Sequence, residues 1–507
     1  MTSDEPPNIA EPAAAPTGGE AAPPASGESW STLQFFTEDH DGMPTIAKTD
    51  AGRFEPSVLF RSRENWLARL QGHARPEARV AAIREDVRAL SAKWLRMQNL
   101  SVLMGAGASF YVTGFAGREL LDRVQRLVEK SPSSPLLREV LTWSSNPGAL
   151  GKRFEEFLSQ LAALARLSDS AAWPLDKLEI PVPLRKRRGA ARRLAALREL
   201  LLDIERAIAV ACNVVLPDSS LGEGSGDPTA HEVFMAKLVA RDPQHGRARL
   251  FTTNYDTLVE QALDRLGILY ADGFSGTVNR RFSPGVYDLD TYYPGEVGEG
   301  RVRRYDKVMQ LFKLHGSINW RRCQPSATNP FGVGFGFGPI PQESEVLSSE
   351  KGRAAFSALL TGTEGLLILP TASKYAETLT MPFAHMQRSM ANLLREPQTV
   401  LFVLGYSGWD SHINQIIHDS LTNPGFTVVV VDPSPSAWAR MLANSDYSGR
   451  VYCFGGEWGR FEFFAKEVLP DLEVLKTELA VARTLRELRA AQDKADTGSA
   501  ETEQENA

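Results

Sequence analysis

Apolar residues recur along the chain in two patterns, one typical of buried strands and one typical of amphipathic helices. Short apolar runs predict strands at 101–104, 248–252, 309–314, 366–369, 399–404, 427–431 and 450–454. Helical spacing predicts helices at 78–97, 194–208, 383–394, 413–421 and 472–488. Because strands that alternate with helices pair in parallel, we expect an open α/β sheet with helices on both faces.

The composition changes along the chain and indicates the domain organisation. The 507 residues are 43% hydrophobic, enough for more than one core. Residues 1–29 are mostly Ala, Pro, Gly, Ser and Glu, which predicts a disordered tail. We expect a mostly helical segment at 30–98 and the α/β domain at 99–470 with a helical insertion at 117–244. A helix and a polar tail then occupy 471–507.

The charge and the cysteine content argue against several classes of protein. The formal net charge of −6 argues against a dominant nucleic-acid surface. The basic run from Arg185 to Arg193 is either a partner or nucleic-acid contact or, as we favour, a solvated face. Three separated cysteines without C-x-x-C spacing predict neither a disulfide framework nor a zinc site. Without a signal peptide or an apolar run of ~20 residues, we expect a cytoplasmic protein.

The strand at 101–104 runs directly into a glycine turn, Gly105-Ala106-Gly107-Ala108-Ser109. Glycine lets the backbone turn sharply and bring its N–H groups against a phosphate, and a following helix points its positive end at the same charge. A dinucleotide-binding fingerprint needs a third glycine where this chain has Phe110. A nucleotide site and a plain turn therefore both remain open at this point.

Polar residues that a structural role does not require follow four other predicted strands. Asn254 and Asp256 come after the strand at 248–252, and a capped turn explains Asp256 better than Asn254. His315, followed by glycine, is expected to be exposed enough to titrate as a general base, although a lone histidine is more often structural. The remaining residues are Gly405 and Ser407 in a second glycine turn and Asp432 at the end of 427–431.

The order of these motifs resembles the sirtuin family. The runs are GAGAS at 105–109, TTNYD at 252–256, KLHGS at 313–317 and GYSGWD at 405–410, followed by Asp432. GYSGWDSHINQII is similar to a bacterial sirtuin-like branch. The resemblance covers about residues 99–470 and implies a Rossmann-like parallel sheet, interrupted by the helical insertion.

The resemblance implies a role for each matching residue. Gly105, Ala106, Gly107 and Ser109 would hold the NAD pyrophosphate. Asn254 would position the nicotinamide ribose and the attacking group, Asp256 would face the nicotinamide, and His315 would be the catalytic histidine. The remaining cofactor-binding residues would be Gly405 and Ser407 for phosphate and Asp432 for the adenine ribose.

Two departures from deacylase sirtuins shape the expected activity. The chain lacks the paired zinc cysteines, and FYVTGFAGREL with Arg118 replaces the usual segment after the glycine loop. Zinc-free bacterial relatives resemble NAD-consuming effectors of antiphage defence. We therefore expect a metal-free NAD hydrolase that uses NAD as substrate and gives nicotinamide and ADP-ribose. The alternatives are a protein deacylase or ADP-ribosyltransferase, and a non-catalytic NAD- or ADP-ribose-binding subunit.

A freely active NAD hydrolase would exhaust its own cell, so the expected activity needs control. We expect self-assembly into a homo-oligomer, a separate activating chain, or both. In the group that this chain resembles, such partners include DNA-translocating ATPases and Argonaute-type proteins. Direct nucleic-acid binding is not favoured and no membrane contact is expected.

Overall fold

The structure is a computed structural model of the whole chain. It describes residues 34–38, 44–46, 58–60, 76–115, 119–130, 137–140, 161–163, 190–221, 224–242, 245–293, 304–336, 338–362, 365–368, 380–443, 445 and 447–476. The tail predicted at 1–29, most of the basic run at 185–193, Arg118 and the predicted polar C-terminal tail lie outside these residues.

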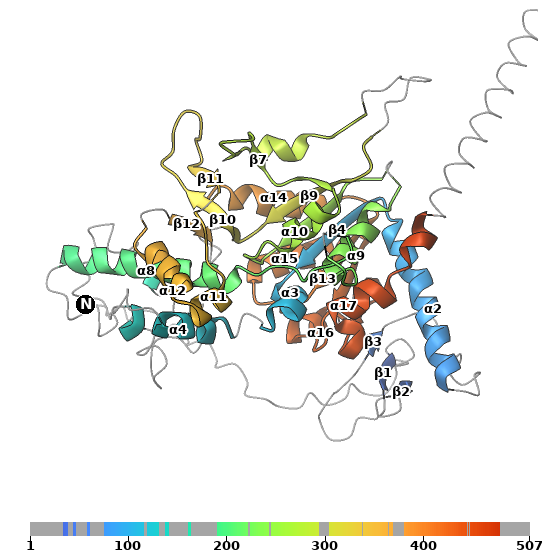
Figure 1. The fold of residues 1–507 in the computed structure, drawn as a ribbon. Coiled ribbons are helices and arrows are strands. Elements are labelled where there is room, and N and C mark those ends of the chain that lie inside the picture. The colour runs from blue at the N-terminus through green and yellow to red at the C-terminus, as the bar shows by residue number, and fades with distance from the viewer. Residues whose placement is uncertain are drawn as a thin grey trace, which may run out of the picture.

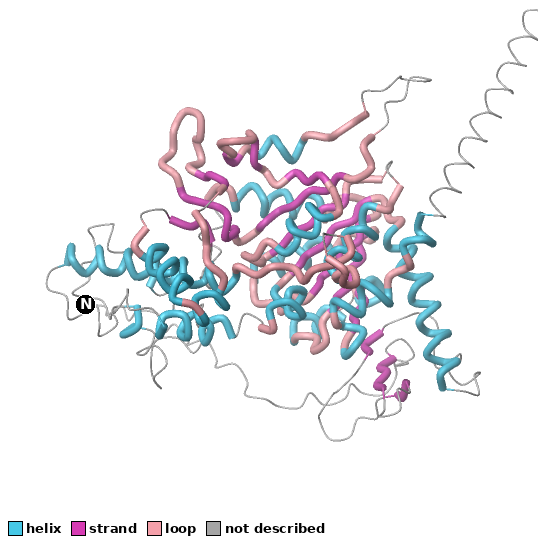
Figure 2. The backbone as a smooth tube through the Cα atoms, in the orientation of Figure 1, coloured by secondary structure: helices cyan, strands magenta, loops and turns pink. Residues whose placement is uncertain are grey.

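A seven-stranded parallel sheet forms the centre of the molecule (Figure 2). Its order is β15-β14-β13-β4-β5-β9-β6, and every neighbouring pair is parallel. The strands are β4 (Asn99–Met104), β5 (Ala248–Thr252), β6 (Leu269–Ala271), β9 (Val308–Lys313), β13 (Thr399–Leu404), β14 (Phe426–Val431) and β15 (Val451–Phe454). The predicted open, Rossmann-like α/β sheet is confirmed.

Both faces of this sheet are buried, which explains why its strands read as continuous apolar runs. In β4, Val102 faces one core and Leu103 the other. The first face is covered by α2 (Pro76–Leu95), α9 (Ala230–Val239), α10 (Leu258–Arg265) and, near the C-terminus, η6 (Gly456–Gly459), α17 (Phe461–Phe463) and η7 (Phe464–Val468). The second is covered by α14 (Phe383–Leu393), α15 (Ser411–Ser420) and α16 (Ala437–Ala443), and η5 (Ser448–Arg450) leads into β15.

A second sheet corrects one expectation. The strand predicted at 366–369 is present as β12 (Gly365–Ile368), but it lies outside the parallel sheet and pairs antiparallel with β10 (Gly316–Arg322). The order of this sheet is β12-β10-β11-β8-β7, with β11 (Val333–Phe335), β8 (Arg281–Phe282) and β7 (Phe274–Ser275), and η3 (Pro284–Asp288) follows β8. Since β9 and β10 are separated only by two residues, the chain reverses after β9 and starts this sheet at once.

A helical unit with its own core packs beside the sheets. It contains α4 (Leu120–Lys130), α8 (Ala190–Cys212), α11 (Glu343–Ser348) and α12 (Glu350–Leu360), and it lies on the left in Figure 1. The helix predicted at 194–208 is confirmed as part of α8. The predicted insertion at 117–244 thus divides between two cores, because α9 packs on the parallel sheet.

The N-terminal segment at 30–98 contributes both strands and a helix. The strands β1 (Gln34–Glu38), β2 (Pro44–Ile46) and β3 (Val58–Phe60) form a small antiparallel sheet. The strand β3 lies against β15, at one edge of the parallel sheet. Helix α2 follows, and its Val87 and Trp94 are buried against that sheet.

Candidate functional site

The predicted polar residues meet at the carboxyl edge of the parallel sheet. The strand register places Met104, Thr252, Lys313, Leu404 and Val431 in one row across the sheet. From β4 the chain proceeds to β5 and β9 on one side, and then to β13, β14 and β15 on the other. Ligands of open α/β sheets bind at such a switch point, outside the carboxyl ends of the strands, which is here between β4 and β13.

The two glycine turns lie directly against each other at this switch point. The Gly105 N–H donates to the Leu404 carbonyl and the Gly107 N–H donates to the Gly405 carbonyl, both at 2.9 Å. A Cβ at Gly105 would lie 2.6 Å from the Gly405 oxygen, and one at Gly107 would lie 2.7 Å from the Gly405 Cα. These glycines are therefore needed because two backbones touch.

This contact changes the expected part of the first turn in phosphate binding. The N–H groups of Gly105 and Gly107 are already engaged by carbonyls of the second turn. Ala106 is exposed at the first position of α3 (Ala106–Thr113), where N–H groups lack intrahelical partners. A pyrophosphate would therefore meet the N-terminal end of α3 and its dipole rather than the two glycine N–H groups.

Asn254 connects the end of β5 with the first glycine turn. Its Nδ2 donates to the Gly105 carbonyl at 3.1 Å and to the Ser109 hydroxyl at 3.0 Å. The Ser109 hydroxyl donates in turn to Oδ2 of Asp256 at 3.0 Å. Asp256 also accepts from the Leu258 N–H at 3.1 Å, as expected for a turn into α10. Four of the predicted residues, Gly105, Ser109, Asn254 and Asp256, thus form one hydrogen-bonded chain.

The Asp256 carboxyl is held in an unfavourable environment for its charge. Burial raises its pKa above the ordinary range, and the ammonium of Lys313 opposes that shift. A carboxyl whose pKa is perturbed by burial and by a specific charge, at the ligand edge of a sheet, is typical of functional sites.

His315 follows β9 and lies deeper than the sequence predicts. It is only 1% exposed, so the expectation of an exposed, freely titrating histidine is wrong for this conformation. The segment after β13 lies beside it. Its Asp410 places Oδ1 3.8 Å from His315 Nε2, and the His412 ring centroid is 6.1 Å from that of His315.

Hydrogen bonds of Tyr406 hold the second glycine turn in place. Its hydroxyl donates to the Asn414 side chain at 3.1 Å and accepts from the Asp410 N–H at 3.2 Å, while Asn414 Nδ2 donates to the Gly408 carbonyl at 2.7 Å. Ser407 lies exposed on this fixed turn. It is thereby presented toward solvent beside the switch point.

Asp432 lies one strand beyond β13, at the end of β14. Its Oδ1 accepts from the Ser434 N–H at 2.9 Å, and burial raises the pKa of its carboxyl. This position is at the same sheet edge as the glycine turns.

Three polar residues of this edge were not assigned a role from the sequence. The Thr252 hydroxyl donates to the Met104 carbonyl and accepts from the Asn254 N–H, each at 3.0 Å. Lys313 is 2% exposed and binds Glu260 through its Nζ, which lies 2.8 Å from Oε1. Lys313 stands inside the run KLHGS, and a lysine in an otherwise buried strand is a signal that charge is compensated nearby.

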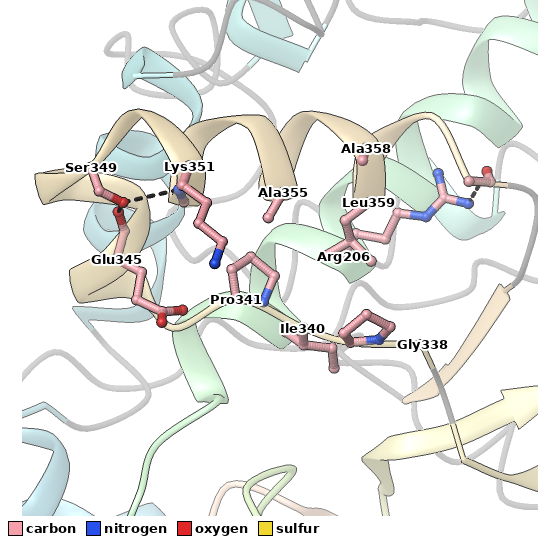
Figure 3. A pocket seen from close by; sticks show the side chains of 13 residues that line it. Arg206, Gly338, Ile340, Pro341, Glu345, Ser349, Lys351, Ala355, Ala358 and Leu359 are labelled. Carbon is pink, nitrogen blue, oxygen red and sulfur yellow. Dashed lines mark hydrogen bonds between the residues drawn. The ribbon is translucent and has the colours of Figure 1, made fainter.

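A cavity of about 530 Å³ lies elsewhere, in the helical unit (Figure 3). Arg206 of α8, the segment Gly338–Pro341 and helices α11 and α12 line it. The side chain of Lys351 points toward Pro341 across this space. None of the predicted site residues lines the cavity, which is therefore separate from the sheet edge.

The described residues lack two features. They contain no group of three or more His, Cys, Asp or Glu side chains placed to hold a metal ion. Within the same part of the chain, no helix is long and apolar enough to cross a membrane.

Part of the chain is similar to a known protein family. Residues 248–448 match the SIR2-like domain family. The match begins at β5 and includes Asn254, Asp256, His315, Ser407 and Asp432, while the glycine turn after β4 precedes it. It supports an NAD-related activity in general terms.

The similarity to solved structures is low, and no curated protein matches. A solved structure of a Sir2 homologue, a triple mutant in complex with 2'-O-acetyl ADP ribose, shares 12% sequence identity. The alignment covers 77% of this chain and 97% of that chain, with a TM-score of 0.32.

Proposed function

We propose that this protein hydrolyses NAD at the bond between nicotinamide and ribose. The observation that carries the proposal is the position of Asn254, which lies in the part of the chain that is similar to the SIR2-like domain family and whose amide joins β5 to the glycine turn at the switch point. A capped turn needs Asp256 but not this amide. Asn254 and His315 extend from neighbouring strand ends, as a water-activating pair requires.

The proposed reaction needs only NAD and water as reactants. The C1'–N1 bond breaks and its electron pair passes to the nicotinamide ring, so the ribose gains oxocarbenium character. Water adds to C1', and its proton goes to His315 directly or through a ribose hydroxyl. In our proposal Asn254 places the water, α3 and Ser407 hold the pyrophosphate, and Asp432 accepts from the adenine ribose. The products are nicotinamide, ADP-ribose and a proton.

The burial of His315 adds a requirement to this mechanism. Asp410, which ends the turn at 405–410, places its Oδ1 3.8 Å from Nε2 of this buried imidazole. A substrate reaches His315 only when this turn moves or when a ribose hydroxyl relays the proton. A closed resting site agrees with an enzyme whose unrestrained activity would harm its own cell.

At the level of the cell, we propose that the protein is an antiphage effector that depletes NAD in an infected cell. Control by homo-oligomerisation or by an activating partner, such as a DNA-translocating ATPase or an Argonaute-type protein, follows from the same argument. Infection of cells carrying the wild type or Asn254→Ala tests this role. We expect NAD to fall on infection only with the wild type; equal NAD levels in both would contradict it.

The biochemical test is incubation of the purified chain with NAD, with and without candidate partners, followed by chromatography and mass spectrometry. We expect equimolar nicotinamide and ADP-ribose. Loss of an acyl group from a peptide would indicate a deacylase, and transfer of label from NAD to protein an ADP-ribosyltransferase. Binding of NAD or ADP-ribose without turnover in any mixture would indicate a non-catalytic subunit.

A further inference from the structure

Two oppositely charged side chains are buried together beside the candidate site. Lys313, at the end of β9, is 2% exposed, and Glu260, on the first turn of α10, is 8% exposed. Their Nζ and Oε1 atoms lie 2.8 Å apart. Lys313 Nζ also donates to the backbone carbonyl of Asp256. One ammonium therefore binds the carboxylate of Glu260 and the main chain of Asp256.

The ammonium is connected to the proposed water-placing amide by a short path. Lys313 holds the Asp256 carbonyl, the Asp256 carboxylate accepts from Ser109, and Ser109 accepts from Asn254. Lys313 is also two residues before His315. A single side chain thus joins the strand end that carries Asn254 to the strand end that carries His315.

Charge balance makes this arrangement sensitive to Lys313. Burial raises the pKa of Asp256, Glu260 raises it further, and Lys313 lowers it. Both donors to the Asp256 carboxylate, the Ser109 hydroxyl and the Leu258 N–H, favour the ionised form. The lysine is the nearby cation that offsets two buried carboxylates.

Other groups near Asp256 do not supply that positive charge. Cys212 faces Asp256 from α8, and burial raises the pKa of its thiol to about 12, so it is neutral. The charges beyond it, Arg123 and Glu343, pair with each other at 2.6 Å. Compensation of Asp256 therefore depends on Lys313.

We propose that Lys313 is a positioning residue for NAD hydrolysis, which fixes the Asn254–Asp256 turn against the glycine turn, with Glu260 as its anchor. The inference rests on the proposed function, because it assigns Lys313 to that same site. It differs from a purely structural role for a buried lysine, which would affect folding and leave the chemistry of folded molecules unchanged.

Lys237 provides a matched control for a buried structural lysine. It lies on α9, is also 2% exposed, and donates to the carbonyls of Ala465 at 2.7 Å and Leu469 at 3.1 Å. It contacts none of the residues proposed to bind or cleave NAD. Lys237→Met should lower the melting temperature and leave kcat per folded molecule unchanged.

The experiment measures kcat, KM, their pH dependence and the melting temperature for Lys313→Met, Glu260→Gln and the double variant. In Lys313→Met we expect kcat to fall about 100-fold, as for a misplaced reacting group, with a smaller change in KM. The acid limb of its pH–kcat profile should move to higher pH, because the pKa of Asp256 rises when the nearby cation is removed. In Glu260→Gln the acid limb should move to lower pH, because a like charge is removed.

The double variant separates positioning from folding. Removing both charges of the pair should return the melting temperature toward the wild-type value, since the Glu260 carboxylate is no longer buried without its cation and only Asp256 loses compensation. Its kcat should stay low, because the link to the Asp256 carbonyl is still missing. The proposal would be overturned if the melting temperature and the kcat of the double variant recovered together. It would also be overturned if Lys313→Met folded with the wild-type kcat and if the acid limb of its pH–kcat profile did not move.

A crystal structure of Lys313→Met gives a readout that does not need turnover. We expect the Asn254 amide to leave the Gly105 carbonyl, from which it lies 3.1 Å in the wild type. If the wild-type chain and its partners release no nicotinamide, the proposed function fails and this distance alone decides the positioning role. An unchanged Asn254 in that structure would then refute it.

Discussion

Two buried clusters of this protein use the same chemistry with opposite results. The Glu232 cluster consists of Glu232, Ser219, Thr229 and Arg265, at the start of α9. The Asp256 cluster consists of Asp256, Ser109, Asn254, Lys313 and Glu260, at the carboxyl edge of the sheet. Each holds a carboxylate beside a cation, yet the pKa of Glu232 is lowered and that of Asp256 is raised.

The difference lies in how completely each carboxylate is satisfied. Glu232 is fully buried, but it accepts from the Ser219 hydroxyl at 2.7 Å, from the Thr229 N–H at 2.7 Å and from Arg265 at 3.2 Å. Its Thr229 bonds form a capping box at a helix N-terminus, where negative charge is favoured. Lys313 instead donates to the Glu260 carboxylate and to the backbone carbonyl of Asp256, and it lowers the pKa of the Asp256 carboxyl through its charge. A satisfied cluster stabilises the fold, whereas an under-compensated one marks a site.

The largest effect that this comparison predicts is on catalysis. His315→Ala and Asn254→Ala should each reduce nicotinamide release by roughly 10²–10⁴-fold, because each removes a group that acts on the attacking water. Release is measured by chromatography at saturating NAD, and folding by circular dichroism. Unchanged NAD loss in both folded variants would remove the catalytic assignment of this edge.

The next effect is on stability, in the other cluster. Glu232→Ala should lower the free energy of unfolding by about 3–5 kcal/mol, because Arg265 loses its buried partner. Denaturant titration measures this change, and nicotinamide release per folded molecule should equal that of the wild type. A loss of activity without a loss of stability would contradict the structural role of the Glu232 cluster.

The Glu232 cluster also borders a histidine that makes stability depend on pH. Burial lowers the pKa of His231 to about 3, from an ordinary value of 6.5, and its Nδ1 lies 2.7 Å from the Tyr111 hydroxyl. The unfolded chain binds a proton below pH 6.5 that the folded protein rejects. The free energy of unfolding should therefore fall as the pH drops from about 6.5 toward 3.

His231→Gln provides the comparison for this pH dependence. The variant lacks the titrating group, so its free energy of unfolding should fall less steeply over the same range, whatever its value at neutral pH. Denaturant titrations at several pH values measure both slopes. Parallel curves for the two proteins would show that His231 is not the group responsible.

The smallest effect concerns the charge of Asp256. Because its pKa is raised in the folded state, the stabilisation associated with this group is lost as the pH rises through that pKa. Asp256→Asn should then leave stability at neutral pH within about 1 kcal/mol of the wild type while lowering activity. Glu232→Gln should cost more stability. Equal losses in the two variants would erase the distinction between the clusters.

Local sequence determined much of the fold. Strands are present at all seven predicted places, since a short apolar run between turns can be buried only as a strand or as a short helical segment. The glycine turns and the polar residues after strands could also be predicted from the sequence, because the backbone conformation and the solvation at each position favour particular residue types. Parallel pairing then predicts that Asn254 and His315 reach one edge.

What the sequence left undecided depends on partners distant along the chain. Gly105 and Gly107 signal a turn, but the fact that Gly405 fills the space beside them required the order of β4 and β13. The strand at 366–369 was recognised, yet its antiparallel partner was not. The burial of His315 beside Asp410 likewise could not be predicted from the residues next to it in the sequence.

The sequence by itself thus determined which residues end the strands and which chemistry they offer. Only the tertiary structure decided which of them share a proton, a charge or a backbone contact, as Lys313 does with Glu260 and Asp256. The physical reason is that strand formation and turns are governed by neighbours in sequence. The compensation of a buried charge is governed by neighbours in space, which are brought together only when the sheet is assembled.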